Sequence, residues 1–167
     1  MSIQFVESHI SRVVIIRVRP GNDLIMGIEE VCERSAISSG SISCCIGSLR
    51  KASFMFLVPF DNRMGAAYCD PVTIEGPVEI LSAQGTIGEQ EGSFYVHLHG
   101  SFVDKHGHVH GGHLIKGQNP VLYTAEIMIC KSDGALMRRL YDPEVGMKVL
   151  TPLEEEQAEF PLRRSEK

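Results

Sequence analysis

The sequence predicts an α+β fold in which one early helix packs against a mainly antiparallel sheet. Two observations support this prediction: a helical apolar periodicity near the N-terminus, and a succession of short strand-like segments after residue 40. Turns of only a few residues separate these segments, and such turns cannot connect parallel neighbours. The 167 residues suit one domain, because a chain of this size buries roughly 70% of its unfolded surface.

The first elements are a strand and the helix. Residues 13–16 are typical of a buried strand, and residues 20–22, Pro-Gly-Asn, end it. Residues 23–35 predict a helix, with Asn22 or Asp23 as its N-cap. The apolar positions that form one helical face are Leu24, Ile28, Val31 and Cys32.

Alternation and turn signals place the strands that follow. Strands are expected at residues 41–49, 52–59, 78–87, 93–103, 109–115 and 121–130. Turns are expected at residues 61–63, 75–77, 88–92, 104–107 and 117–120. We assign residues 1–150 to a single domain and residues 151–167 to a charged tail, which Phe160 and Leu162 could dock on the body.

Composition argues against several classes of protein. The net charge of -5 disfavours a bare nucleic-acid binder, which needs basic residues to neutralise phosphates. Five cysteines without a CxxC spacing give neither a disulfide framework nor a zinc ribbon, and fit small buried side chains in a reducing cytoplasm. We find no apolar run of about 20 residues, no secretory signal and no GxSxG nucleophile motif.

The chemistry is expected where six of the seven histidines gather, between residues 97 and 113. Period-2 alternation puts Tyr95, His97 and His99 on one face of their strand. Two imidazoles at this spacing are about 6.5–7 Å apart at Cα, close enough to converge on one ion.

A third histidine joins them in one particular hairpin register. A three-residue loop at residues 105–107, with Gly107 left-handed, pairs Asp104 with His108 and His99 with His113. In that register His97, His99 and His113 share a face. A two- or four-residue loop, or a bulge at Gly111–Gly112, would break the alignment, because a one-residue slip reverses the face.

Three neutral imidazoles with an open position suit catalytic zinc, and they also suit other first-row metals. Asp104 and Glu126 are candidates to orient the imidazoles or to act as a general base. The alternative is that the histidines lie on a solvated sheet face or pack at a subunit contact. His106, His108 and His110 are expected to be exposed, without a metal role. Gly111 and Gly112 fit either a bulge or the close approach of another backbone or a ligand.

An ordered set of short motifs resembles the plants and prokaryotes conserved (PPC) domain, also called the domain of unknown function 296 family. The motifs are residues 47–50 (GSLR), 76–82 (GPVEILS) with Gly85, 97–99 (HLH), Gly107 with 111–114 (GGHL), and 124–127 (TAEI). The resemblance covers about residues 12–130. It implies an α/β domain with a mostly antiparallel sheet flanked by helices, a homotrimer, and, in prokaryotic members, a metal at His97, His99 and His113.

The same resemblance bears on DNA. Plant members carry an AT-hook before the domain, but no Arg-Gly-Arg occurs in this chain. The DNA-binding description of stand-alone prokaryotic members therefore transfers poorly. Three functions stay open: a homotrimeric DNA-binding, regulatory or assembly module with a histidine metal site, zinc first; a metal-dependent enzyme acting on an unidentified small molecule; and a structural trimer with histidines at its interface.

Overall fold

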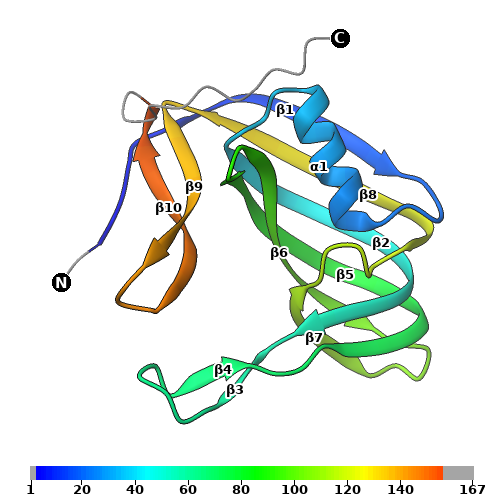
Figure 1. Cartoon of the computed structure of the whole chain (residues 1–167). Coiled ribbons are helices and arrows are strands. Elements are labelled where there is room, and N and C mark those ends of the chain that lie inside the picture. Colours follow the sequence, from blue (N-terminus) through cyan, green and yellow to red (C-terminus); the bar gives the residue numbers. More distant parts are fainter. Residues whose placement is uncertain (1–2, 156–167) are drawn as a thin grey trace.

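The computed structural model describes residues 3–155, which form a curled, mainly antiparallel sheet with a helix packed against its concave side (Figure 1). The tail docking expected for Phe160 and Leu162 lies outside the described residues. The elements in chain order are β1 (His9–Val18), α1 (Leu24–Arg34), β2 (Gly40–Met55), β3 (Leu57–Pro59), β4 (Ala66–Tyr68), β5 (Val72–Gln90), β6 (Ser93–Val103), β7 (Val109–Leu114), β8 (Val121–Asp133), β9 (Ala135–Asp142) and β10 (Met147–Glu154).

The long strand β2 holds the sheet together. The strand order is β1-β8-β2-β7-β6-β5-β9-β10, and β2 also pairs with β5, which curls the sheet. Among the described strands, all pairings are antiparallel except one bridge between β5 and β9. The predicted antiparallel sheet with one helix is therefore confirmed. The resemblance implied several flanking helices, whereas residues 3–155 contain one α-helix, which is not long and apolar enough to span a membrane.

Helix α1 is tied to a distant loop at its first turn. Asp23 is the N-cap, and its Oδ1 accepts a hydrogen bond from the Met26 amide at 3.0 Å. The other carboxylate oxygen, Oδ2, accepts from the Asn119 amide at 2.7 Å. The fully buried Asn119 side chain bonds in turn to Ser53 and to the Ile115 carbonyl, so its polar atoms are satisfied.

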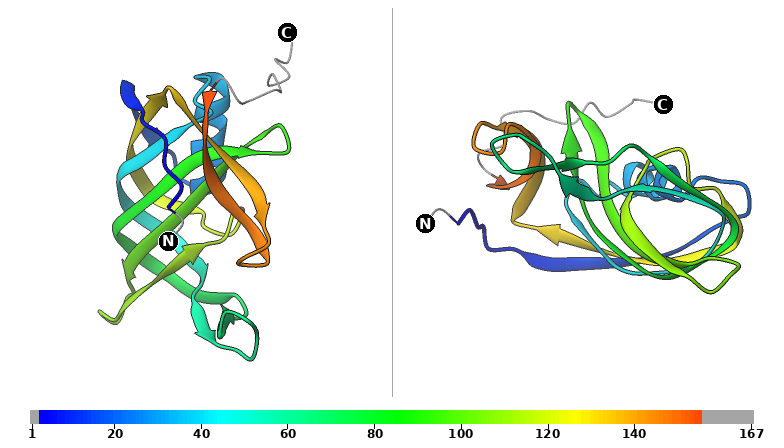
Figure 2. Two further views of the ribbon diagram at one scale, coloured as in Figure 1. Left: turned by 90° about the vertical axis from the view of Figure 1, so that its left-hand side faces the viewer. Right: turned by 90° about the horizontal axis from the view of Figure 1, so that it is seen from below.

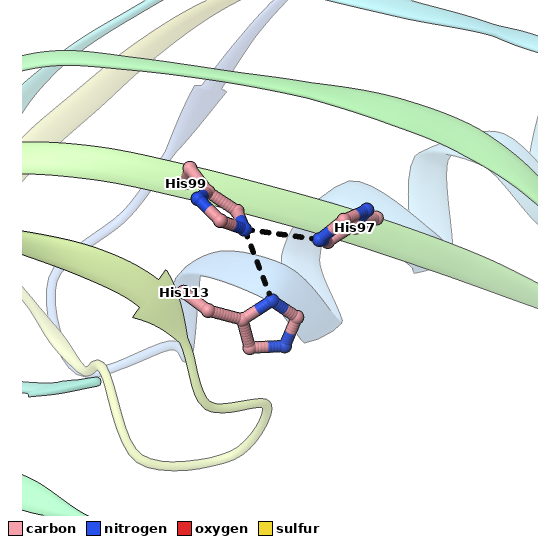
Figure 3. A group of neighbouring side chains, drawn as sticks. All are labelled: His97, His99 and His113. Atoms are coloured by element: carbon pink, nitrogen blue, oxygen red, sulfur yellow. Dashed lines mark hydrogen bonds between the residues drawn. The ribbon is translucent and has the colours of Figure 1, made fainter. Parts of the chain in front are cut away.

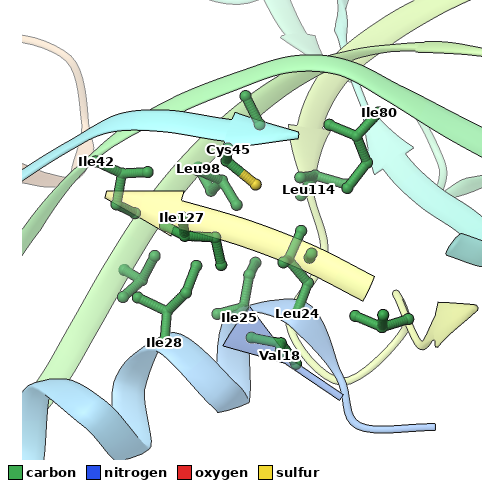
Figure 4. Close-up of a cluster of buried hydrophobic side chains, with 14 of the residues drawn as sticks. Val18, Leu24, Ile25, Ile28, Ile42, Cys45, Ile80, Leu98, Leu114 and Ile127 are labelled. Atoms are coloured by element: carbon green, nitrogen blue, oxygen red, sulfur yellow. The ribbon is translucent and has the colours of Figure 1, made fainter. Parts of the chain in front are cut away.

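The core lies between α1 and the concave face of the sheet (Figure 4). The apolar stripe of the helix meets the inward side chains of β2, β5, β6 and β8. In β6 these inward residues are Val96, Leu98 and Phe102, which leaves the residues between them on the opposite face.

Two expected boundaries were wrong in the middle of the chain. β2 is continuous to Met55, with a register shift between Leu49 and Lys51 in place of a break. β5 runs through residues 75–77, where we expected a turn. At this point the two strands lie so close that a Cβ at Gly76 would be 2.1 Å from the Arg50 carbonyl oxygen. A glycine here therefore permits strand pairing and does not mark a turn.

Two hairpins extend the curled sheet (Figure 2). β3 and β4 form a small separate arm around the expected turn at residues 61–63. β9 and β10 form a second hairpin that the sequence analysis did not predict. β10 continues to Glu154, past residue 150, where we expected the domain to end and the charged tail to follow.

Candidate metal centre

The β6–β7 hairpin has the register that the sequence predicted. Gly107 has a φ of 84°, and the Asp104 amide donates to the His108 carbonyl at 3.0 Å. The register continues without a shift to the pair His99 and His113. The three-residue loop is therefore confirmed, and it determines which histidines share a face.

His97, His99 and His113 converge (Figure 3). His99 Nε2 lies 3.0 Å from His97 Nε2 and 3.3 Å from His113 Nδ1. One ligand nitrogen from each ring lies within 4.8 Å of the others. Without a cation, nitrogens this close need a shared proton, because their lone pairs would otherwise repel. The chemistry of the donor set fits one metal ion on three imidazoles, with His99 exposed to solvent.

The surroundings of this cluster favour neutral imidazoles. Burial lowers the pKa of His113 to about 4, and His97, His99 and Arg139 add to the shift. Burial also lowers the pKa of His97, with further contributions from His99 and Arg139. Because only an unprotonated imidazole nitrogen can bind a metal, these two side chains are ready to bind at neutral pH.

Two tyrosines and an arginine surround the imidazoles. The Tyr68 ring, from the β3–β4 arm, lies 5.5 Å from the ring of His113. Tyr95 precedes His97 on the same face of β6. The guanidinium carbon of Arg139, from β9, lies 4.7 Å from the centroid of the Tyr95 ring. Tyr95 was expected on this face, whereas Tyr68 and Arg139 were not, because the strands that carry them, β4 and β9, were not predicted from the sequence.

The structure places Asp104 away from the imidazole cluster. Its carboxylate accepts hydrogen bonds from the amides of His106 and His108 at 2.8 and 2.9 Å, and lies 3.0 Å from His110 Nε2. These contacts hold the pKa of Asp104 below its usual range, and the contact with His110 contributes most. Asp104 thus organises the hairpin tip, where His106 and His108 are exposed as expected, whereas His110, also expected to be exposed, is half-buried against Asp104.

Glu126 lies elsewhere as well. It is exposed on β8 and lines a surface groove with Glu79, Tyr123 and Asp104. None of the three clustered histidines lines that groove. The structure therefore does not bring the two expected carboxylates to the imidazoles.

The paired glycines allow close backbone contacts beside His113. A Cβ at Gly112 would be 2.4 Å from the Met55 carbonyl oxygen, and one at Gly111 would be 2.9 Å from the Gly100 oxygen. The register is continuous across both residues, so there is no bulge here. Of the two expected roles for these glycines, the close approach of another backbone is the one observed. Gly112 thereby lets β7 contact β2 next to the cluster.

The fold and the histidine cluster lead to a family. The model of the Plants and Prokaryotes Conserved (PCC) domain, which is the PPC family named above, matches residues 6–133. The chain belongs to this family.

Solved structures share the fold. A metal-containing protein of Archaeoglobus fulgidus is similar, with a TM-score of 0.75 and 25% identity over 89% of this chain and 99% of that chain. A plant- and prokaryote-conserved protein of Pyrococcus horikoshii has a TM-score of 0.75 and 23% identity over 91% and 99%. A candidate DNA-binding protein of Ralstonia eutropha JMP134 has a TM-score of 0.65 and 27% identity over 81% and 88%.

Curated relatives are longer proteins. The bifunctional protein GlmU of Synechococcus sp. strain JA-3-3Ab is 29% identical over 136 residues, which is 81% of this chain and 20% of the relative. GlmU of strain JA-2-3B'a(2-13) is 30% identical over 132 residues, which is 78% of this chain and 18% of the relative. The chain thus spans about a fifth of the length of these relatives.

Proposed function

We propose that this chain is a metal-carrying PPC module that assembles as a homotrimer and binds one divalent ion, zinc, on His97, His99 and His113. The observation that carries the proposal is the convergence of three imidazole nitrogens within 4.8 Å. The metal-containing protein of Archaeoglobus fulgidus, with the same fold, supports it.

The donor set favours zinc. Three imidazoles with an open position match a common zinc geometry, in which a bound metal can polarise a ligand or lower the pKa of bound water. Buried cysteines offer no competing site, because burial raises the pKa of Cys32 and Cys45 to about 12 and keeps both thiols protonated. Five free cysteines also fit the reducing cytoplasm that we propose as the location.

An exposed apolar stripe supports self-association. Val13 and Ile15 of β1 face outward beside Met128 of β8, and Ile46 of β2 continues the stripe. Ile15 is 76% exposed in the isolated chain. A contiguous apolar surface on an edge strand and its neighbours is typical of an interface, and a trimer would cover it.

Direct DNA contact has less support. The net charge is -5, and the adjacent pair Arg138 and Arg139 lies against this chain's own Glu89, Gln90 and Tyr95. We therefore assign the module a role in assembly or regulation and not in reading DNA. The second candidate is a metal-dependent enzyme acting on a small molecule. The exposed position of His99 favours this candidate, because a metal bound there would be accessible to a substrate.

Elemental analysis of tag-free protein, purified without a nickel column, tests the metal site. We expect close to one metal per chain, and loss of the metal in the double variant His97→Ala, His99→Ala. The matched control is the double variant His106→Ala, His108→Ala, which removes two imidazoles from the hairpin tip and should keep the metal. Substoichiometric metal that the first double variant leaves unchanged would overturn the proposal.

Light scattering coupled to gel filtration tests the assembly. Ile15→Asp should convert the trimer to smaller species without unfolding it, because the side chain is exposed in the isolated chain. Val109→Asp is the control, since Val109 is also exposed, at 65%, but lies at the β6–β7 hairpin tip. A wild-type monomer, or an equal effect of both variants, would contradict the proposed interface.

A further inference from the structure

Arg139 is a half-buried cation without an acidic partner in the part of the chain that the structure describes. Its Nη1 donates to Gln90 Oε1 at 2.8 Å, and its guanidinium lies over the Tyr95 ring. Its neighbour Arg138 differs, because that guanidinium pairs with the buried Glu89. A guanidinium has five N–H donors, so a single bond to a neutral amide leaves most of them for another acceptor.

Arg139 lies beside the imidazoles because it contacts Tyr95, which shares a face of β6 with His97 and His99. Tyr95, His97 and His99 follow one another along one face of β6, in steps of about 6.5–7 Å. Since Arg139 covers the Tyr95 ring, it lies at one end of this row, and Tyr68 beside His113 lies across the cluster. The effect of the Arg139 charge on the pKa of both His97 and His113 agrees with this placement.

The charges around the cluster are unbalanced. The three ligands are neutral when they bind a metal, so a divalent ion brings two positive charges and Arg139 adds a third. The side chains that contact the imidazoles or continue their row are Tyr68, Tyr95 and Arg139, none of which is negative at neutral pH. The charge of Glu29 also acts on Tyr95, but Glu29 is paired with Lys116. Asp104 and Glu126 lie at the separate groove. A partly buried centre of this kind attracts an anion to complete its charge and coordination.

We propose that Arg139 makes this centre a binding site for a small molecule with a carboxylate or phosphate group. Arg139 binds that group, and another oxygen of the same molecule takes the open position on the metal. The inference rests on the metal site of the proposed function. Arg139 belongs to the β9–β10 hairpin, which begins after the family match ends at residue 133, so the matched family domain does not include this residue.

The test uses the full chain with Co²⁺ in the histidine site, because anions that bind Co²⁺ change its visible spectrum. Acetate is the single-group probe; oxalate, malonate and succinate are graded two-group probes; and inorganic phosphate separates the phosphate source from the carboxylate source. In wild type, the best two-group probe or phosphate should bind at least about ten-fold more tightly than acetate, as expected for added charge-assisted hydrogen bonds.

Variants locate the effect. Arg139→Gln should abolish the preference over acetate, and Arg139→Lys should retain part of it, because lysine keeps the charge but not the fork of donors. Lys148→Gln is the matched control: it removes a positive charge from the same hairpin, where Lys148 pairs with the exposed Glu91. Anion binding unchanged in Arg139→Gln, or lost equally in Lys148→Gln, would overturn the inference.

The two proposals fail differently. A wild-type protein that takes up no Co²⁺ contradicts the metal site itself. A protein that takes up Co²⁺ and shows no preference for any two-group anion or phosphate over acetate contradicts only the role of Arg139. Folding of each variant is checked by circular dichroism, and Arg139→Lys keeps the test informative if Arg139→Gln does not fold.

Discussion

One hairpin carries two histidine clusters with different environments. His97, His99 and His113 have ring centroids 4.9 to 5.2 Å apart. At the hairpin tip, the rings of His106, His108 and His110 are 6.2 to 6.5 Å apart from one to the next. At the tip, the Asp104 carboxylate contacts the rings of His108 and His110, whereas within residues 3–155 no carboxylate pairs with a ring of the first cluster.

The difference shows that histidine density alone does not define a metal site. At the tip, the Asp104 carboxylate already accepts hydrogen bonds from the amides of His106 and His108 and lies 3.0 Å from His110 Nε2. In the first cluster, burial lowers the pKa of His97 and His113, so the lone pairs of these two imidazoles stay available to a cation. The electrostatic partner therefore separates the two clusters more clearly than their spacing.

The largest expected effect comes from His99→Ala. His99 lies between the other two rings and contacts both. Its loss removes the central ligand and leaves only two imidazoles to hold the metal. We expect metal affinity to fall by at least ~100-fold, beyond the effect of removing a group that only orients a ligand. Competition with a chromogenic chelator measures it. His108→Ala at the tip should match wild type, and an equal loss in both variants would remove the distinction between the clusters.

Gly112→Ala should break the first cluster through the backbone. The added Cβ would meet the Met55 carbonyl oxygen at 2.4 Å, so β7 must move away from β2 and carry His113 with it. We expect a loss of about 3 kcal/mol in unfolding free energy, by urea denaturation, together with reduced metal content. Gly107→Ala meets no atoms within 4 Å and should cost only about 1 kcal/mol, with the metal retained. Full metal content in Gly112→Ala would refute this account of the paired glycines.

Lowering the pH should reduce the stability of the metal-free fold in different pH ranges for the two clusters. The unfolded chain protonates His113 below about pH 6.5, but the metal-free fold does so only below about 4. The unfolded state therefore binds more protons between these values, and stability falls as the pH decreases through this window. For the half-buried His113, we expect the free energy of unfolding at pH 5 to be about 1 kcal/mol lower than at neutral pH, after allowing for solvent screening.

The control for this window is His113→Asn, whose metal-free stability should change less between pH 7.5 and 5 than that of wild type. Asp104 has a lowered pKa and loses its stabilising contribution only as the pH falls below about 3.8, the ordinary value of a carboxyl. Equal pH dependence of wild type and His113→Asn would show that burial does not disfavour the charged imidazole.

Asp104→Ala should have the smallest effect on the metal. The variant removes the acceptor for the amides of His106 and His108, so these amides should exchange faster with solvent deuterium. Metal content should stay at the wild-type level, because Asp104 contacts the tip and not the metal cluster. Loss of metal in this variant would restore the role that we first expected for Asp104.

The sequence predicted those features that rest on strong local signals. The helix follows from its apolar spacing and Asp23 cap, and the β6–β7 register follows from the turn chemistry of Gly107. That register brought together His97, His99 and His113 without further information. Turn residues failed as a guide at residues 75–77, where Gly76 serves a close strand contact.

The rest depends on contacts that a single sequence does not display. Most side chains of β9 and β10 are half-buried, so they lack the apolar alternation that marks a strand with one buried face. One signal for this hairpin was present: residues 142–146, Asp-Pro-Glu-Val-Gly, form its turn, with Gly146 at a φ of 73°. Arg139 could not be assigned to the site before this hairpin was placed.

The contact between Asp23 and Asn119 sets an order of events for folding. The first turn of α1 is completed by a loop 96 residues further along the chain. Closing so long a loop costs entropy before the contact returns stability, so we expect the contact between Asp23 and Asn119 to form only after most strands have paired. In a chain that emerges from the ribosome N-terminus first, Asp23 can cap α1 through the Met26 amide at once, but its second carboxylate oxygen has no partner until residue 119 has been synthesised. Although α1 is synthesised early, we therefore expect its first turn to be among the last parts of the fold to become rigid.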